Sequence, residues 1–109
     1  MDNRPDVLPG TTTKVRTGCG SLYVTVNDYE GKPCELFLRM GKSGGCAHAT
    51  TESIGRLGSA LMQRGADIDF IIKQLGGVSC HADSDAHPSC PDAVARVLKG
   101  LEKKDAGEA

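Results

Sequence analysis

Residues 20–40, GSLYVTVNDYEGKPCELFLRM, decide the fold of this chain. In the first half, apolar and polar side chains alternate from Leu22 to Val26, a period of two that is typical of a half-buried strand. The alternation returns from Cys34 to Met40, and residues 27–33 between the two halves are rich in turn-forming types. Residues 20–27 and 34–40 are therefore predicted to form an antiparallel hairpin, preceded by a further extended segment at 14–18.

The apolar pattern changes to helical spacing after the hairpin. Ile54, Leu57, Leu61 and Met62 form one stripe, and the helix is expected to end at Gly65, a residue type that favours helix C-termini. A second, short helix is predicted from Ile68 to Leu75, with Asp67 as its cap and the glycines at 76–77 as its end.

A third helix is predicted to begin near Cys90, after a polar loop at 78–89. Pro91 suits the first turn of a helix, and the carboxylate of Asp92 suits the positive end of the helix dipole. Val94, Val97, Leu98 and Leu101 supply its apolar stripe.

A hairpin is not stable alone, so the three helices must cover one of its faces. The predicted fold class is α+β, a small antiparallel hairpin or meander covered by about three helices. This domain is expected over residues 14–101. Residues 1–13 are interpreted as an extended, largely disordered lead-in, and residues 102–109 as a polar tail.

Charge and hydropathy exclude several classes of function. The chain has 13 basic and 14 acidic residues, and no basic cluster along the sequence, which argues against charge-driven nucleic acid binding. No apolar run approaches the roughly 18 residues of a membrane span. Residues 1–13 also lack the apolar core of a secretion signal, so we expect a cytoplasmic protein without membrane contact.

Four of the five cysteines lie at predicted element boundaries, beside glycine or proline: Cys19, Cys46, Cys80 and Cys90. Cytosolic thiols stay reduced, which favours metal binding or catalysis over disulfides. Zinc takes four such ligands, and helix starts favour the thiolate form. Since the chain has no C-x-x-C pair, the spacing alone leaves a metal site open. Cys34 alternates with Leu36 and Leu38 and is predicted to be a core residue.

Other chemistry was considered for the same segments. His81 or His87 could replace a cysteine ligand. Cys80 and Cys90 could instead form a redox pair that exchanges thiols and a disulfide. Lys42, Ser43, Gly44 and Gly45 follow a strand, but a Walker A motif needs a glycine where this chain has Leu36. Only a weaker site remains there, in which backbone N–H groups bind an anion or nucleotide.

Several blocks of the sequence resemble the TSCPD domain family. They are residues 87–93 (HPSCPDA), 17–27 (TGCGSLYVTVN), 40–46 (MGKSGGC), 52–57 (ESIGRL), 72–80 (IKQLGGVSC) and 4–10 (RPDVLPG). They occur in the expected order and cover about residues 4–101. The one departure is Pro88, where the motif that names the family has Thr.

This resemblance implies a context in nucleotide metabolism. The family occurs at the C-terminus of vitamin B12-dependent (class II) ribonucleotide reductases and as small stand-alone proteins, which this chain resembles. It implies that Cys19, Cys46, Cys80 and Cys90 act together as a structural zinc site. The expected partner is a ribonucleotide reductase or another nucleotide-metabolism enzyme. The chain is too short for a reductase barrel and has no feature for cobalamin, so it is not expected to be an enzyme alone. Sheet edges paired across a two-fold axis would give a homodimer.

Overall fold

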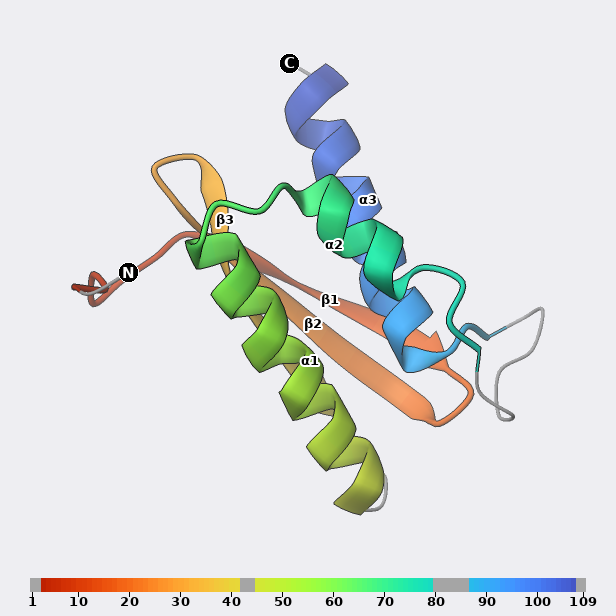
Figure 1. The fold of residues 1–109 in the computed structure, drawn as a ribbon. Coiled ribbons are helices and arrows are strands. Elements are labelled where there is room, and N and C mark those ends of the chain that lie inside the picture. Colours follow the sequence, from red (N-terminus) through yellow and green to blue (C-terminus); the bar gives the residue numbers. More distant parts are fainter. Residues whose placement is uncertain (1–2, 42–44, 80–86, 108–109) are drawn as a thin grey trace.

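The computed structural model describes residues 3–41, 45–79 and 87–107, with the backbone alone at 45–46 and 103–107. Three antiparallel strands in the order β1-β2-β3 form one sheet, and three helices lie on one side of it (Figure 1). The elements are β1 (Gly10–Thr17), β2 (Gly20–Tyr29), β3 (Lys32–Met40), α1 (Gly45–Gln63), α2 (Ile68–Leu75) and α3 (Cys90–Gly107). This arrangement confirms the predicted α+β class with a small antiparallel sheet.

Two tight turns connect the strands. β2 and β3 are joined by Glu30 and Gly31, whose φ angles of 53° and 81° place both in the left-handed region. That pair of angles is typical of the two-residue turns whose twist matches a hairpin. β1 pairs with β2 from Gly10 to Thr17, so the sheet includes the last four residues of the predicted lead-in. At the other end of the chain, α3 continues to Gly107, into the predicted polar tail.

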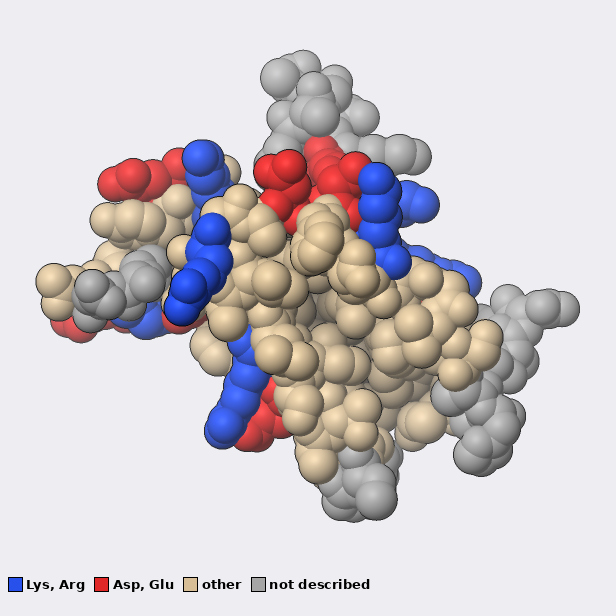
Figure 2. Space-filling view, in the orientation of Figure 1, with Lys and Arg blue, Asp and Glu red and all other residues tan. Residues whose placement is uncertain are grey.

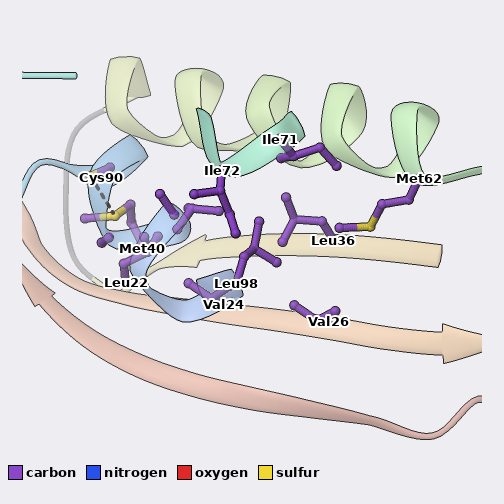
Figure 3. Packing of buried hydrophobic residues seen from close by; sticks show 13 residues of the cluster. Leu22, Val24, Val26, Leu36, Met40, Met62, Ile71, Ile72, Cys90 and Leu98 are labelled. Atoms are coloured by element: carbon purple, nitrogen blue, oxygen red, sulfur yellow. Dashed lines mark hydrogen bonds between the residues drawn. The ribbon is translucent and has the colours of Figure 1, made fainter. Parts of the chain in front are cut away.

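The core lies between the inner face of the sheet and the helices (Figure 3). The alternation predicted for β2 is confirmed, because Leu22 and Val24 are fully buried and Val26 is nearly so. Cys34 is buried too, as predicted. The buried cluster comprises Leu22, Val24, Val26, Leu36 and Met40 of the sheet, with Met62, Ile71, Ile72, Cys90, Ala93, Val94, Ala95 and Leu98 of the helices. No helix in the described ranges is both long and apolar enough to span a membrane.

The ends of α2 lie where they were predicted, but the first is not capped as expected. Asp67 occupies the N-cap position with extended backbone angles, yet its side chain makes no capping hydrogen bond. Its carbonyl accepts from the N–H of Phe70 at 3.0 Å instead. Gly76 follows the helix, and its N–H donates to the carbonyl of Ile72 at 2.8 Å.

Helix α1 buries only part of the stripe that its apolar residues predict, since Met62 is buried and Leu61 packs against the core. Leu57 was expected in the core stripe but is 67% exposed. The buried positions are Thr51, Gly55, Gly58 and Met62, which also have helical spacing. A Cβ atom on Gly55 would lie 3.0 Å from the carbonyl oxygen of Leu36. The small residues therefore let α1 approach the backbone of β3, which a leucine stripe would prevent.

Ser59 completes this contact by bonding to the free edge of β3. Its hydroxyl accepts from the N–H of Leu36 at 2.8 Å and donates to the carbonyl of the same residue at 3.1 Å. One turn further along α1, the Gln63 amide donates to the carbonyl of Cys34 at 3.0 Å. Polar side chains of α1 thus take the place of a fourth strand, because they satisfy backbone groups that would otherwise be unpaired.

A buried carboxylate on the outer face of β3 anchors the N-terminal segment. Glu35 is 6% exposed and accepts two hydrogen bonds from the Arg4 guanidinium, at 2.6 and 3.1 Å, and one from Asn27 at 2.9 Å. The sequence alternation predicts the outer face for Glu35 but not its burial. Arg4 lies in the lead-in that was interpreted as largely disordered, so this ion pair attaches that segment to the sheet.

We predict that Ser59→Ala lowers the free energy of unfolding by about 1–3 kcal/mol, because the Leu36 N–H and carbonyl lose their partner while remaining partly buried. Ser53→Ala is the matched control on the same helix, since the exposed Ser53 hydroxyl donates only to the carbonyl of Ala49. Urea unfolding of both variants measures the difference. Equal stabilities for the two variants would show that the edge contact contributes nothing.

The Arg4–Glu35 pair should make stability depend on pH. Hydrogen bonds from Arg4, opposed by desolvation, lower the pKa of Glu35 below its ordinary value of 4.5. The unfolded chain therefore binds a proton at higher pH than the folded one, and the contribution present at neutral pH is lost as pH falls below 4.5.

The Tm of the wild type should fall at acid pH, and we call this fall the acid limb. We predict that Glu35→Gln flattens the acid limb in thermal unfolding curves recorded from pH 7 to pH 3. Glu52→Gln removes the exposed ion pair of Glu52 with Arg56 and should leave the acid limb unchanged. An acid limb equally steep in the wild type and in Glu35→Gln would contradict the assignment.

Candidate metal centre

Two of the four predicted ligands, Cys19 and Cys90, lie at the same end of the sheet. Cys19 is in the two-residue turn between β1 and β2, and Cys90 is the first residue of α3. The N–H of Gly18 donates to the carbonyl of Pro88 at 3.2 Å, and this hydrogen bond joins the two segments. Cys19 directly follows Gly18, and Cys90 is two residues beyond Pro88. Positions far apart in sequence are thereby placed side by side.

The Thr17 hydroxyl contacts both cysteines. It accepts from the backbone N–H of Cys19 at 3.1 Å and donates to the carbonyl of Gly20 at 2.7 Å, which fixes the turn. The Cys90 thiol lies 3.8 Å from the same oxygen. Thr17 itself is 3% exposed. One buried hydroxyl therefore positions the backbone of one candidate ligand and the sulfur of the other.

Cys90 points toward the interior of the protein. It is 8% exposed, and its sulfur lies 3.9 Å from the sulfur of Met40 (Figure 3). Cys19, in contrast, is exposed. The boundary position of Cys90 was predicted from the sequence, whereas its membership of the core was not. A metal at this end would be held between the core and the surface.

The start of α3 also anchors the segment that leads to Cys80. Ser89 is 1% exposed; it caps α3 by accepting from the N–H of Asp92 at 3.2 Å, and its hydroxyl donates to the carbonyl of Val78. The Asp92 carboxylate accepts from the N–H of Gly77 at 2.9 Å. Val78, whose carbonyl is held at the start of α3, is only two residues before Cys80 in the sequence.

The end of β3, which leads toward Cys46, is at this same end of the sheet. The N–H of Gly41 donates to the carbonyl of Ser21 at 2.9 Å, next to the β1–β2 turn. Cys46 is in the first turn of α1, but its side chain lies outside the described residues, as does all of Cys80. The structure thus places Cys19 and Cys90 at the same end of the sheet, while Cys80 and the Cys46 side chain lie outside the described residues.

The remaining candidate residues are only partly described. His81, Lys42, Ser43 and Gly44 lie outside the described residues. His87 is exposed, just before the start of α3. Within the described ranges, no three His, Cys, Asp or Glu side chains are grouped so that they could hold a metal ion. Cys80 and the side chain of Cys46 lie outside these ranges, so the four-cysteine site stays a prediction.

One hydrogen bond bears on the weaker anion site at residues 42–45. A backbone loop binds an anion through N–H groups that have no other acceptor. The N–H of Gly41, which precedes the loop, is already bonded to Ser21. Gly45 begins α1, and the intervening residues are outside the described ranges. Leu36 stands where a Walker A motif needs a glycine, and it is buried inside β3.

Cys34 is separate from the other cysteines in both place and chemistry. Burial is the main cause that raises the pKa of its thiol, and the carboxylates of Glu35 and Asp28 raise it further. A thiol with a raised pKa stays protonated at neutral pH and is a poor metal ligand. The prediction that Cys34 is a core residue is confirmed.

Sequence reasoning missed Thr17, Ser89 and Met40, which surround the two cysteines. Ser89 and Asp92 have the Ser-x-x-Asp spacing that resembles a capping box, so the cap could have been predicted. No sequence signal marks Thr17 or Met40, because their roles depend on contacts with α3.

Comparison with known proteins identifies the family. Neither the curated proteins nor the solved structures compared with this chain gave a match. A family model, that of the TSCPD domain, matches residues 2–101. The match includes all four boundary cysteines, both strand turns and the start of α3, and it extends the resemblance seen in the sequence by two residues toward the N-terminus. The chain therefore belongs to the TSCPD domain family.

Proposed function

We propose that this protein is a structural zinc-binding accessory domain that works with ribonucleotide reductase, with Cys19, Cys46, Cys80 and Cys90 as the zinc ligands. The observation that carries the proposal is the Thr17 hydroxyl, which contacts the N–H of Cys19 and the thiol of Cys90. The hydrogen bonds of Ser89 and Gly41 at the same end of the sheet support it.

The donor set suits zinc in a structural role. Four thiolates fill the tetrahedral positions of zinc and leave none open for a substrate, which is the pattern of structural rather than catalytic sites. Cys90 is the first residue of α3, at the same end of the sheet as Cys19. Zinc would supply a cross-link among four segments that are distant in the chain, and Cys90 and Cys19 would present their sulfurs from positions held by Thr17.

Such a cross-link has a clear purpose in this fold. The β1–β2 turn contacts the α3 start through the backbone bond from Gly18 to Pro88 and through the Thr17 hydroxyl. Closing a chain segment of about 70 residues carries a substantial entropy cost, so a metal that joins these segments stabilises the folded state. With few aromatic residues, 4% of the chain, the core has limited apolar area to offset that cost.

The burial of Cys90 favours a structural role over the redox alternative. A dithiol that exchanges electrons must present at least one sulfur to a large partner protein. The Cys90 thiol is instead 8% exposed and packs against Met40. In a Cys80–Cys90 redox pair, Cys90 would therefore not be the sulfur that meets the partner protein.

The reductase link rests on membership of the TSCPD family. In reductases the family's domain is joined covalently to the catalytic part, so we expect the surface of this domain to contact that enzyme. We therefore propose that the zinc site holds the shape of a docking module and takes no part in catalysis.

We predict about one zinc per chain in protein purified without added metal, measured by elemental analysis. Cys19→Ser and Cys90→Ser should each lower the zinc content several-fold, because a structural site needs all four ligands. Cys34→Ala is the matched control and should keep its zinc. A chelator should lower the Tm of the wild type and leave that of Cys90→Ser almost unchanged.

The cysteine variants also separate the two roles. A redox pair depends on Cys80 and Cys90 alone, so Cys19→Ser would retain a reversible disulfide, detected by thiol titration before and after oxidation. The zinc site requires Cys19 equally. Wild-type protein with neither zinc nor iron would overturn the structural proposal. If His87→Ala loses zinc and Cys19→Ser retains it, His87 rather than Cys19 is the fourth ligand.

We further predict that the zinc-loaded protein co-purifies with the ribonucleotide reductase of the same cell, and that Cys90→Ser co-purifies several-fold less. Cys34→Ala should bind like the wild type. Size-exclusion chromatography of the purified pair measures the complex directly. Full zinc content without any complex would separate the two parts of the proposal, because it would support the zinc site and remove the reductase as partner.

A further inference from the structure

The outer face of the sheet, opposite the helices, carries a set of basic side chains. Strand alternation directs Lys14 and Arg16 of β1 to this face, and Arg39 of β3 joins them through the register Lys14–Tyr23–Arg39. All three basic residues are exposed. The basic residues are separated in sequence, and the sheet brings them together, so the linear search for basic clusters could not find this one.

A carboxylate shares this face of the described strands with the basic set. The acidic residue in the same alternating set is Glu35, and its carboxylate is already paired with Arg4. The helix-covered side differs, because there acidic and basic side chains are mixed near the upper margin and much of the surface is uncharged (Figure 2). The chain as a whole has a net charge of −1, although the outer face of its sheet is positive.

Two aromatic rings lie within the basic set. Phe37 is 53% exposed. Tyr23 is half-buried, and the Arg39 guanidinium lies 5.8 Å from the centre of its ring. Tyr23 pairs with Arg39 and Phe37 with Thr25, so the two rings are diagonal neighbours across β2 and β3.

The rings border a shallow hollow of about 450 Å³. Thr12 and Thr25 lie beside it, and their hydroxyls are 2.7 Å apart. The hollow offers apolar ring faces, hydroxyl groups and guanidinium donors, but its lining includes no carboxylate. A ligand that fits must present flat apolar surfaces together with negative charge.

A second copy of this chain does not fit these conditions, because two identical basic faces repel each other. An acidic peptide supplies the charge but no flat rings. Single-stranded nucleic acid supplies both, since its bases stack on aromatic side chains and its phosphates bind Lys and Arg.

We propose that the outer face binds single-stranded nucleic acid. A base stacks on the exposed ring of Phe37, and Lys14, Arg16 and Arg39 bind the phosphates that flank it. This surface is formed by the sheet alone, on the side opposite the helices, so the inference does not depend on the zinc proposal.

The test is fluorescence anisotropy of a labelled 12-nucleotide thymidine strand with the full-length protein in 50 mM salt. Phe37→Ala should weaken binding about fivefold or more, because one base loses its stacking partner, whereas Phe37→Tyr should bind like the wild type. Combined Lys14→Ala, Arg16→Ala and Arg39→Ala should abolish binding. Arg56→Ala on the exposed face of α1 is the matched charge control and should have no effect.

Salt and competitors complete the experiment. Three phosphate contacts predict that affinity falls roughly 20-fold between 50 and 200 mM salt. Duplex DNA and polyglutamate should compete poorly, because neither presents free bases. Equal competition by polyglutamate, binding of thymidine triphosphate as tight as that of the strand, or no binding at 50 mM salt would each overturn the proposal. An unchanged circular dichroism spectrum and Tm of the triple variant would show that a loss of binding is not a loss of fold.

Discussion

The hydroxyl of Ser59 on the free edge of β3 is the contact on which the rest of this structure depends. A three-stranded sheet has two edges, and backbone groups left unpaired at a buried edge are costly. Because Ser59 serves both the N–H and the carbonyl of Leu36, α1 can lie against that edge instead of only on the face. The position of α1 then sets where its first turn, which contains Cys46, begins.

The small residues of α1 explain why its orientation could not be predicted. Helix prediction from sequence weights large apolar side chains, so Leu57 was assigned to the core and Gly55 to no role. The face of α1 that packs against β3 carries glycines in place of large side chains, since Gly55 and Gly58 leave room for the backbone and side chain of Leu36. Strand β2 was easier to predict, because its burial alternates as its side chains do.

The candidate site shows the same division between local and tertiary information. Each cysteine could be assigned to a boundary from its neighbours, and Cys34 to the core from its alternation. That Cys19 and Cys90 lie together depends on the bond from Gly18 to Pro88, between residues that no local pattern connects. The burial of Glu35 depends likewise on a distant residue, Arg4. The basic outer face could be found only after the register of β1, β2 and β3 was known.

The place of α3 in the chain has a consequence for synthesis on the ribosome. The strands and α1 consist of residues up to Gln63, yet the inner face of β2 is buried by Val94 and Leu98, which are fully buried themselves. While α3 is still inside the ribosomal tunnel, the apolar face of the nascent sheet has no complete cover. The emerging hairpin and α1 would be a substrate for chaperones until the last helix docks.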